Sequence, residues 1–193
     1  MTVTGVRAQW APGAVKSVAD FQAAIGKAET ITDTFSNDIP GAVEITFDSG
    51  VVSTLVGGEQ GFANEDNAVS GGRFAGGMDG NGIGGALSLA WTFPMPVIGF
   101  VAEFVLNEFV RLDVSIPGSG RFFDVNTETG EERGIFGLVD TVTPFTQIQF
   151  SVLDSILVDN FSIDKLTFAA APTAADVLEP ARRRGSASRW RAS

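Results

Sequence analysis

The residues that most often carry catalytic and metal chemistry are unevenly represented in this sequence. The chain has 193 residues, with no His and no Cys. This excludes a Ser-His-Asp triad, a thiolate nucleophile, a disulfide framework and most transition-metal sites. Carboxylates remain, with 23 Asp and Glu residues, and oxygen ligands of this kind suit Ca²⁺.

One group of carboxylates lies near the expected first and last strands. Asp33 and Asp38 lie on or near the first strand, and Asp159 and Asp164 on or near the last. The first and last strands of a jelly roll are often neighbours, so the sequence predicts a structural Ca²⁺ bound by these four carboxylates. The alternative is that they form turns and caps, where Asp is favoured.

Paired carboxylates for glycosidase-like acid–base work are not well placed. Glu103 and Glu108 are the nearest pair, and an offset of five puts them on opposite faces of a strand. We therefore predict no catalytic residues and no enzymatic activity.

A long Gly-, Asn- and Asp-rich stretch covers residues 57–82 and predicts a functional or mobile loop. Its end resembles the start of a calcium loop, but Ile83 stands where a third oxygen ligand belongs. Glycan binding needs exposed aromatic rings, and the chain has three Trp and no Tyr. Most of its 16 Phe residues fall at strand positions expected to face the core, which weakens the prediction of glycan binding without excluding it. The candidate ligand-binding residues are Trp10, Asn64, Asp66, Asn67, Asp79 and Asn81.

Charge is strongly partitioned along the chain, whose net charge is −10. Five of the 13 basic residues lie at positions 182–191. Residues 1–180 therefore contain the other eight basic residues together with all 23 acidic residues. Such an acidic body repels phosphate backbones, and we predict no nucleic-acid partner.

No leader or membrane span is predicted in this chain. The first residues lack an apolar segment typical of a signal peptide. Residues 83–102 carry no charge, but Pro94 and Pro96 interrupt them, so two buried strands joined there explain them better than a transmembrane helix.

Periodicity divides the chain into three parts. Residues 1–28 hold a short helix at 17–25, capped by Ser17 and ended by Gly26, which packs on the body. Residues 29–170 show period-two strands punctuated by Gly and Pro, which predicts an all-β, two-sheet antiparallel β-sandwich (jelly roll). Residues 171–193 lack a pattern and predict a disordered basic tail.

Alternation also predicts which side chains lie in the core. The expected strands include Val43 to Asp48 and Val110 to Ile116. The parity of apolar residues changes between Ile163 and Leu166, which predicts a β-bulge near Asp164-Lys165. Phe47, Leu112, Val114, Ile148 and Phe150 are predicted to be buried, with Glu44, Arg111, Asp113 and Gln149 exposed.

Several segments together resemble the bacterial exported β-sandwich proteins that carry PEP-CTERM or VPLPA-CTERM sorting tails. The C-terminal end departs from that pattern, because Glu179-Pro180-Ala181 runs directly into three Arg residues without an apolar helix, as in a degenerate sorting tail. The matching segments are ITFDSGVVST (45–54), WTFP (91–94), VIGF (97–100), GIFGLV (134–139), PFTQIQF (144–150) and DNFSIDKLTF (159–168).

The resemblance implies export to the cell surface or extracellular matrix and a jelly-roll sandwich. The predicted function is a non-enzymatic structural or adhesive role, with polysaccharides or other surface proteins as partners. The alternative is a carbohydrate-binding module that recognises an exopolysaccharide through residues 57–82 or a concave sheet face.

Overall fold

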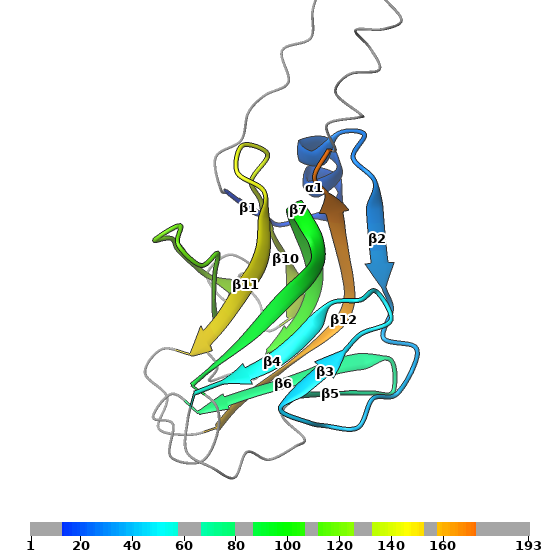
Figure 1. Ribbon diagram of the computed structural model, residues 1–193, viewed down its shortest axis with the longest axis vertical. Helices are drawn as coiled ribbons and strands as arrows, with labels where there is room; N and C mark the ends of the chain where they lie inside the picture. The colour runs from blue at the N-terminus through cyan, green and yellow to red at the C-terminus, as the bar shows by residue number, and fades with distance from the viewer. Residues whose placement is uncertain are drawn as a thin grey trace, which may run out of the picture.

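The computed structural model describes residues 13–57, 67–79, 87–106, 112–125, 133–152 and 158–172. Within these residues the chain is almost entirely β-structure, with one short helix (Figure 1). The elements in chain order are β1 (Gly13–Val15), α1 (Val18–Ile25), β2 (Thr30–Asp33), β3 (Glu44–Thr46), β4 (Val52–Val56), β5 (Asn67–Ser70), β6 (Arg73–Asp79), β7 (Ser88–Leu106), β8 (Leu112–Ser115), β9 (Phe122–Asp124), β10 (Arg133–Val139), β11 (Phe145–Val152) and β12 (Val158–Ala170).

Strand β7 is central to the fold because it belongs to two layers. Residues 88–92 pair with β4 on one side and β11 on the other, whereas residues 97–106 pair with β12 and β10. Pro94 and Pro96 lie between these parts, and proline has no N–H to donate to a ladder. The sequence predicted two joined strands here, and the structure has one continuous strand whose halves serve different layers.

The remaining strands extend these two layers. The front layer has the order β3-β4-β7-β11-β8-β9, and β4, β7 and β11 lie side by side in Figure 1. The back layer has the order β5-β6-β12-β7-β10-β1, with β2 beside the end of β12. All these pairs are antiparallel, so the predicted all-β sandwich is confirmed.

Aromatic rings fill the space between the layers. The ring centroid of Trp91 in the front layer lies 5.3 Å from that of Phe74 in the back layer, and Phe150 lies 5.5 Å from Phe161. These spacings and the tilted or edge geometries are those that aromatic pairs prefer. Most of the described Phe residues therefore belong to the core between the two layers.

The short helix covers the outer side of the back layer, as predicted. The Ser17 side chain accepts a hydrogen bond from the Asp20 N–H at 3.0 Å, and Gly26 ends the helix with φ of +65°. Phe21 and Ile25 are buried against Val101 and Val139 in a second apolar cluster. A Cβ on Gly99 would lie 2.7 Å from the Leu138 carbonyl oxygen, so glycine is required beneath this contact.

Most of the predicted core is confirmed, with two exceptions. Phe47, Leu112, Val114, Ile148 and Phe150 are buried, Glu44 is exposed and Gln149 is half-buried, whereas Arg111 lies outside the described residues. Asp113 was predicted to be exposed and is buried, and the whole of β8 from Leu112 to Ser115 is buried on both faces. Val43 is exposed, because β3 begins only at the next residue.

The β-bulge near Asp164 is also confirmed. The pairing of β12 with β7 shifts register between Ile163 and Lys165, so that both Ile163 and Leu166 reach the core.

The predicted long loop at residues 57–82 is wrong for its middle part. Residues 67–79 form a β5–β6 hairpin whose Gly71 and Gly72 both have positive φ, as a tight hairpin turn of type I′ requires.

The chain ends lie largely outside the described residues, which stop at residue 172. The predicted disordered tail is therefore untested beyond that point. The Ala171 N–H still donates to the Pro96 carbonyl oxygen at 2.9 Å, so the folded sandwich extends into the predicted tail segment. No helix within the described residues is long and apolar enough to span a membrane.

Phe150 provides a test of the core. Replacing it with Ala removes a fully buried ring that contacts Trp91, Phe104 and Phe161. We expect Phe150→Ala to lower the free energy of unfolding by about 3–5 kcal/mol in urea denaturation. Phe122→Ala is the matched control, because Phe122 is 68% exposed and its loss should change stability by less than about 0.5 kcal/mol. Equal effects of the two substitutions would contradict this assignment of core and surface.

Candidate functional site

The carboxylate of Asp33, a predicted calcium ligand, is buried and engaged by the backbone. It accepts hydrogen bonds from the Phe35 N–H at 2.8 Å and the Ser49 N–H at 2.9 Å. The first bond holds Phe35 at φ of +53°, a left-handed conformation that is uncommon for a bulky residue. Asp33 therefore shapes the chain that leaves β2, and the predicted neighbouring of first and last strands is confirmed by its pairing opposite Leu166.

The other calcium candidates have different partners. Asp38 accepts a hydrogen bond from the Gly71 N–H at 3.0 Å, and the Asp159 side chain is not among the described ones. Asp164 lies at the β12 bulge and forms ion pairs with Arg73 of β6 at 2.8 Å and Arg133 of β10 at 2.6 Å. Among the described residues, no group of three or more acidic side chains is placed to bind a metal ion.

The geometry therefore gives the four-carboxylate site no support, and calcium binding stays a prediction. Two cations beside Asp164 compete directly with Ca²⁺ for its oxygens. If calcium binds the folded state alone, a hundredfold excess over Kd adds about 2.7 kcal/mol of stability. Equal melting temperatures in millimolar Ca²⁺ and in EDTA would contradict the prediction that the protein binds calcium.

Arg133 links the bulge to a candidate catalytic carboxylate. Its Nε lies 2.8 Å from a carboxylate oxygen of Glu103 on β7, and its Nη2 lies 2.6 Å from a carboxylate oxygen of Asp164. The hydrogen bond to Glu103, together with the charges of Glu103 and Asp164, raises the pKa of the Arg133 guanidinium. Glu103 is thus held as a salt-bridge partner, and Glu108 lies outside the described residues.

The predicted ligand-binding residues are mostly beyond the described part of the chain. Trp10, Asn64, Asp66 and Asn81 all lie outside it, and only the backbone of Asp79, at the end of β6, is described.

Asn67 is described and corrects the prediction, because its side chain is fully buried. Its Nδ2 donates to the Ala42 carbonyl at 2.8 Å and the Ser53 carbonyl at 3.2 Å. Its Oδ1 accepts from the Ser53 hydroxyl at 2.6 Å, and that hydroxyl also accepts from Trp91 Nε1 at 3.2 Å. Asn67 therefore joins β5 of the back layer to β4 of the front layer and is closed to a ligand.

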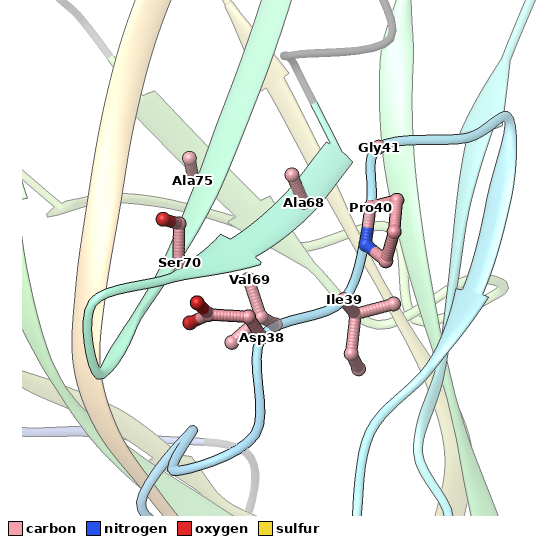
Figure 2. A pocket seen from close by; sticks show the side chains of 8 residues that line it. All are labelled: Asp38, Ile39, Pro40, Gly41, Ala68, Val69, Ser70 and Ala75. Carbon is pink, nitrogen blue, oxygen red and sulfur yellow. The ribbon is translucent and has the colours of Figure 1, made fainter.

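A shallow groove of about 480 Å³ lies where β5 meets the segment before β3. Figure 2 shows the small side chains of Ala68, Ser70 and Ala75 on the hairpin, beside Ile39 and Pro40 on the neighbouring segment. Ile39 and Val69 exchange two backbone hydrogen bonds, at 2.8 and 3.0 Å, which fix this segment along the β5 edge. The groove offers little hydrogen-bonding chemistry, since Asp38 already accepts a bond from Gly71.

The outward side of the front layer, here called the front face, is different in character. Its residues occupy every second position of the strands and align in rows that cross the strands at roughly 4.8 Å per strand. Ser88, Ala90, Asp113 and Ser115 in these rows are buried, whereas Thr46, Thr92 and Phe122 are exposed. Most carry hydroxyl or amide groups. The three rows are Thr46, Val52, Thr92 and Gln147; Glu44, Thr54, Ala90, Gln149, Ser115 and Phe122; and Val56, Ser88, Ser151, Asp113 and Asp124.

Side chains on the front face are held in place by one another. Gln147 donates to the Thr92 hydroxyl at 3.2 Å, and Gln149 donates to the Ser88 hydroxyl at 2.8 Å. Each amide keeps a carbonyl oxygen and a second N–H for other partners. Thr92 is exposed and both Gln side chains are half-buried, so this part of the face holds oriented neutral donors and acceptors that are partly accessible.

Phe122 ends the middle row and was missed by the sequence analysis. It lies opposite Ser115 on β8 and is 68% exposed, while the adjacent Phe123 packs towards the core. Two consecutive Phe residues in a strand must point to opposite faces, which is the signal that could have identified one exposed ring. The front face thus combines an aromatic platform with rows of polar groups.

Asn67 provides a test that separates a structural from a ligand-binding role. We expect Asn67→Ala to lower the free energy of unfolding by at least about 2 kcal/mol, because it leaves buried carbonyl and hydroxyl groups unpaired. Asn37→Ala is the matched control, since Asn37 is exposed and, among the described residues, donates a hydrogen bond to Asp48 at 2.5 Å. Chemical denaturation of both variants measures the difference. An Asn67→Ala protein as stable as Asn37→Ala would contradict the buried network.

Comparison with known proteins gives little further guidance. No protein-family model and no curated protein matches the chain. Among solved structures, the chain is similar to a family two carbohydrate esterase from Cellvibrio japonicus, with 12% sequence identity and a TM-score of 0.34. The similar region covers 76% of this chain and 36% of that chain, and it indicates no activity for this protein.

Proposed function

We propose that the protein is a non-enzymatic, adhesive β-sandwich of the cell surface or extracellular matrix that binds polysaccharide through its front face. The observation that carries the proposal is the exposed ring of Phe122 in one row with the half-buried Gln149, the buried Ser115 lying between them. Sugar rings have an apolar C–H side and a polar rim, so they suit an aromatic platform flanked by hydrogen-bonding groups.

The polar rows supply what the ring alone cannot. An aromatic contact favours any sugar ring, whereas hydroxyl and amide groups at fixed positions select hydroxyl orientations. Gln147 and Gln149 are suited to this because hydrogen bonds to Thr92 and Ser88 already fix their amide planes. Preorganised groups lose little side-chain entropy on binding, which improves affinity.

The non-enzymatic part of the proposal rests on the residues that could perform catalysis. The sequence has neither His nor Cys, and Glu103 is committed to an ion pair with Arg133. The cell-surface part rests on the resemblance to exported sandwich proteins with sorting tails.

Phe122 provides the test of this function. Electrophoresis of the native protein in gels that contain polysaccharide measures binding as retardation. We expect at least one polysaccharide to retard the protein and Phe122→Ala to weaken that affinity about tenfold, the equivalent of about 1.4 kcal/mol. Phe122→Trp should restore binding, because it restores an aromatic platform.

Val142→Ala is the control for loss of an exposed apolar side chain elsewhere, since Val142 is 54% exposed and lies in the turn before β11. It should bind as the unmodified protein does. Binding by Phe122→Ala that equals the unmodified protein would overturn the proposed site, and retardation by no polysaccharide would overturn the function.

A further inference from the structure

One end of the sandwich, here called the tip, is formed by three short segments whose residues are all uncharged. These segments are residues 94–96 within β7, 141–144 between β10 and β11, and 171–172 after β12. The Ala171 N–H donates to the Pro96 carbonyl oxygen at 2.9 Å, and Phe145, which follows the second segment, pairs with Val97. The three segments therefore meet, and Figure 1 shows the turn before β11 and the end of β12 at the upper end of the molecule.

Apolar side chains at the tip face the solvent. Met95 is 37% exposed, Val142 is 54% exposed, and the prolines of the three segments are exposed as well. The turn that presents Val142 is fixed, because one carboxylate oxygen of the buried Asp140 accepts the N–H groups of Val142 and Thr143 at 3.0 and 2.8 Å. A preformed apolar surface of this kind is typical of a site that contacts a partner or a membrane.

The described part of the chain both begins and ends at the tip. Gly13 pairs with Val139, the residue before the Asp140 turn. Residue 172 lies two positions beyond the end of β12, in the third segment of the tip. Residues 1–12 and 173–193 are therefore joined to the sandwich at this one end.

These two joined segments differ in charge from the rest of the chain. Residues 1–12 and 173–193 contain six basic residues and two acidic ones, whereas residues 13–172 contain seven basic and 21 acidic ones. The two segments also contain Trp10 and Trp190. Trp is favoured at the headgroup level of a membrane, and clustered Arg residues attract anionic lipid.

From this arrangement we infer that the tip docks on an anionic lipid surface. Met95 and Val142 enter the boundary between headgroups and acyl chains, while Arg residues of the joined segments bind lipid phosphates. An uncharged apolar tip beside basic segments matches the layers of a membrane, in which anionic headgroups cover an apolar interior. The acidic remainder of the chain is repelled by such a surface, which disfavours every other orientation.

Co-sedimentation of the full chain with lipid vesicles tests this inference. Vesicles of phosphatidylcholine alone are compared with vesicles of equal parts phosphatidylcholine and phosphatidylglycerol. We expect the mixed vesicles to bind at least about tenfold more tightly, because each Arg close to an anionic surface adds to the attraction. Raising NaCl from about 0.1 M to about 0.5 M should weaken this binding, since salt screens the attraction.

Val142→Asp and Leu87→Asp separate the tip from the total charge of the protein. Each variant replaces an exposed apolar side chain with a carboxylate, and Leu87, which is 47% exposed, directly precedes β7 at the opposite end of its front half from Pro94. We expect Val142→Asp to weaken binding to the mixed vesicles at least about fivefold and Leu87→Asp to change it less than about twofold. Met95→Asp is a second variant of the tip with the same expected loss, and melting temperatures verify that all three variants are folded.

A further variant tests the basic segment. Changing Arg182, Arg183 and Arg184 together to Gln should weaken binding to the mixed vesicles about tenfold and leave binding to phosphatidylcholine unchanged.

The remaining outcomes contradict the inference in distinguishable ways. If Val142→Asp, Met95→Asp and Leu87→Asp all bind as the unmodified protein does, the basic segments bind alone and the tip is not the site. Equal binding to the two kinds of vesicle would overturn the anionic surface, and binding to neither would overturn lipid docking altogether. A dimer in sedimentation equilibrium that Val142→Asp converts to a monomer, without vesicle binding, would assign the tip to a second copy of the chain.

Discussion

The constraint on which the structure depends is the pair of prolines in the middle of β7. A strand of 19 residues would normally continue a single sheet, but Pro94 and Pro96 cannot donate to neighbouring strands. The β4 ladder ends at Thr92 and the β11 ladder shifts register across the prolines to Val97. The strand thereby carries Trp91 into the front layer and Phe104 into the back layer. Every other strand finds its place by pairing, directly or through a neighbour, with one half of β7.

Polar contacts complete what the apolar core begins. The aromatic contacts between layers are nondirectional enough to tolerate sliding, whereas Asn67 fixes β5 to β4 through bonds of defined geometry. On the back layer, Arg133 and Asp164 join β7, β10, β12 and β6 across the bulge. The described candidates Asp33, Asn67, Glu103 and Asp164 thus position strands and turns. On the front face of the described residues, Thr92 and Phe122 are exposed and Gln147 and Gln149 are half-buried.

Features set by local sequence could be predicted, and those set by neighbouring strands could not. The helix was predictable because Ser17 and Gly26 mark its ends, and the bulge at Asp164 because apolar parity changes there. The β5–β6 hairpin was missed because its many glycines resemble a loop, although Gly71-Gly72 is itself a hairpin signal. The burial of Asp113 and Asn67 depends on which strands lie beside them, and alternation along one strand does not contain that information. The exposure of one Phe at this strand could have been predicted, because Phe122 and Phe123 are consecutive and adjacent residues of a strand point to opposite faces.

The pairing of β2 with β12 has a consequence for how the chain acquires its structure. Thr32 and Thr167 share a hydrogen bond at 3.0 Å across 135 positions, so β2 cannot pair with β12 until the chain has been synthesised past Thr167. The second half of β7 likewise waits for β10 and β12. Long-range pairing of this kind slows folding, because a large loop must close before the contacts that reward it can form. A nascent chain with this topology therefore leaves β2 and the second half of β7 without these partners until β10 and β12 have been synthesised.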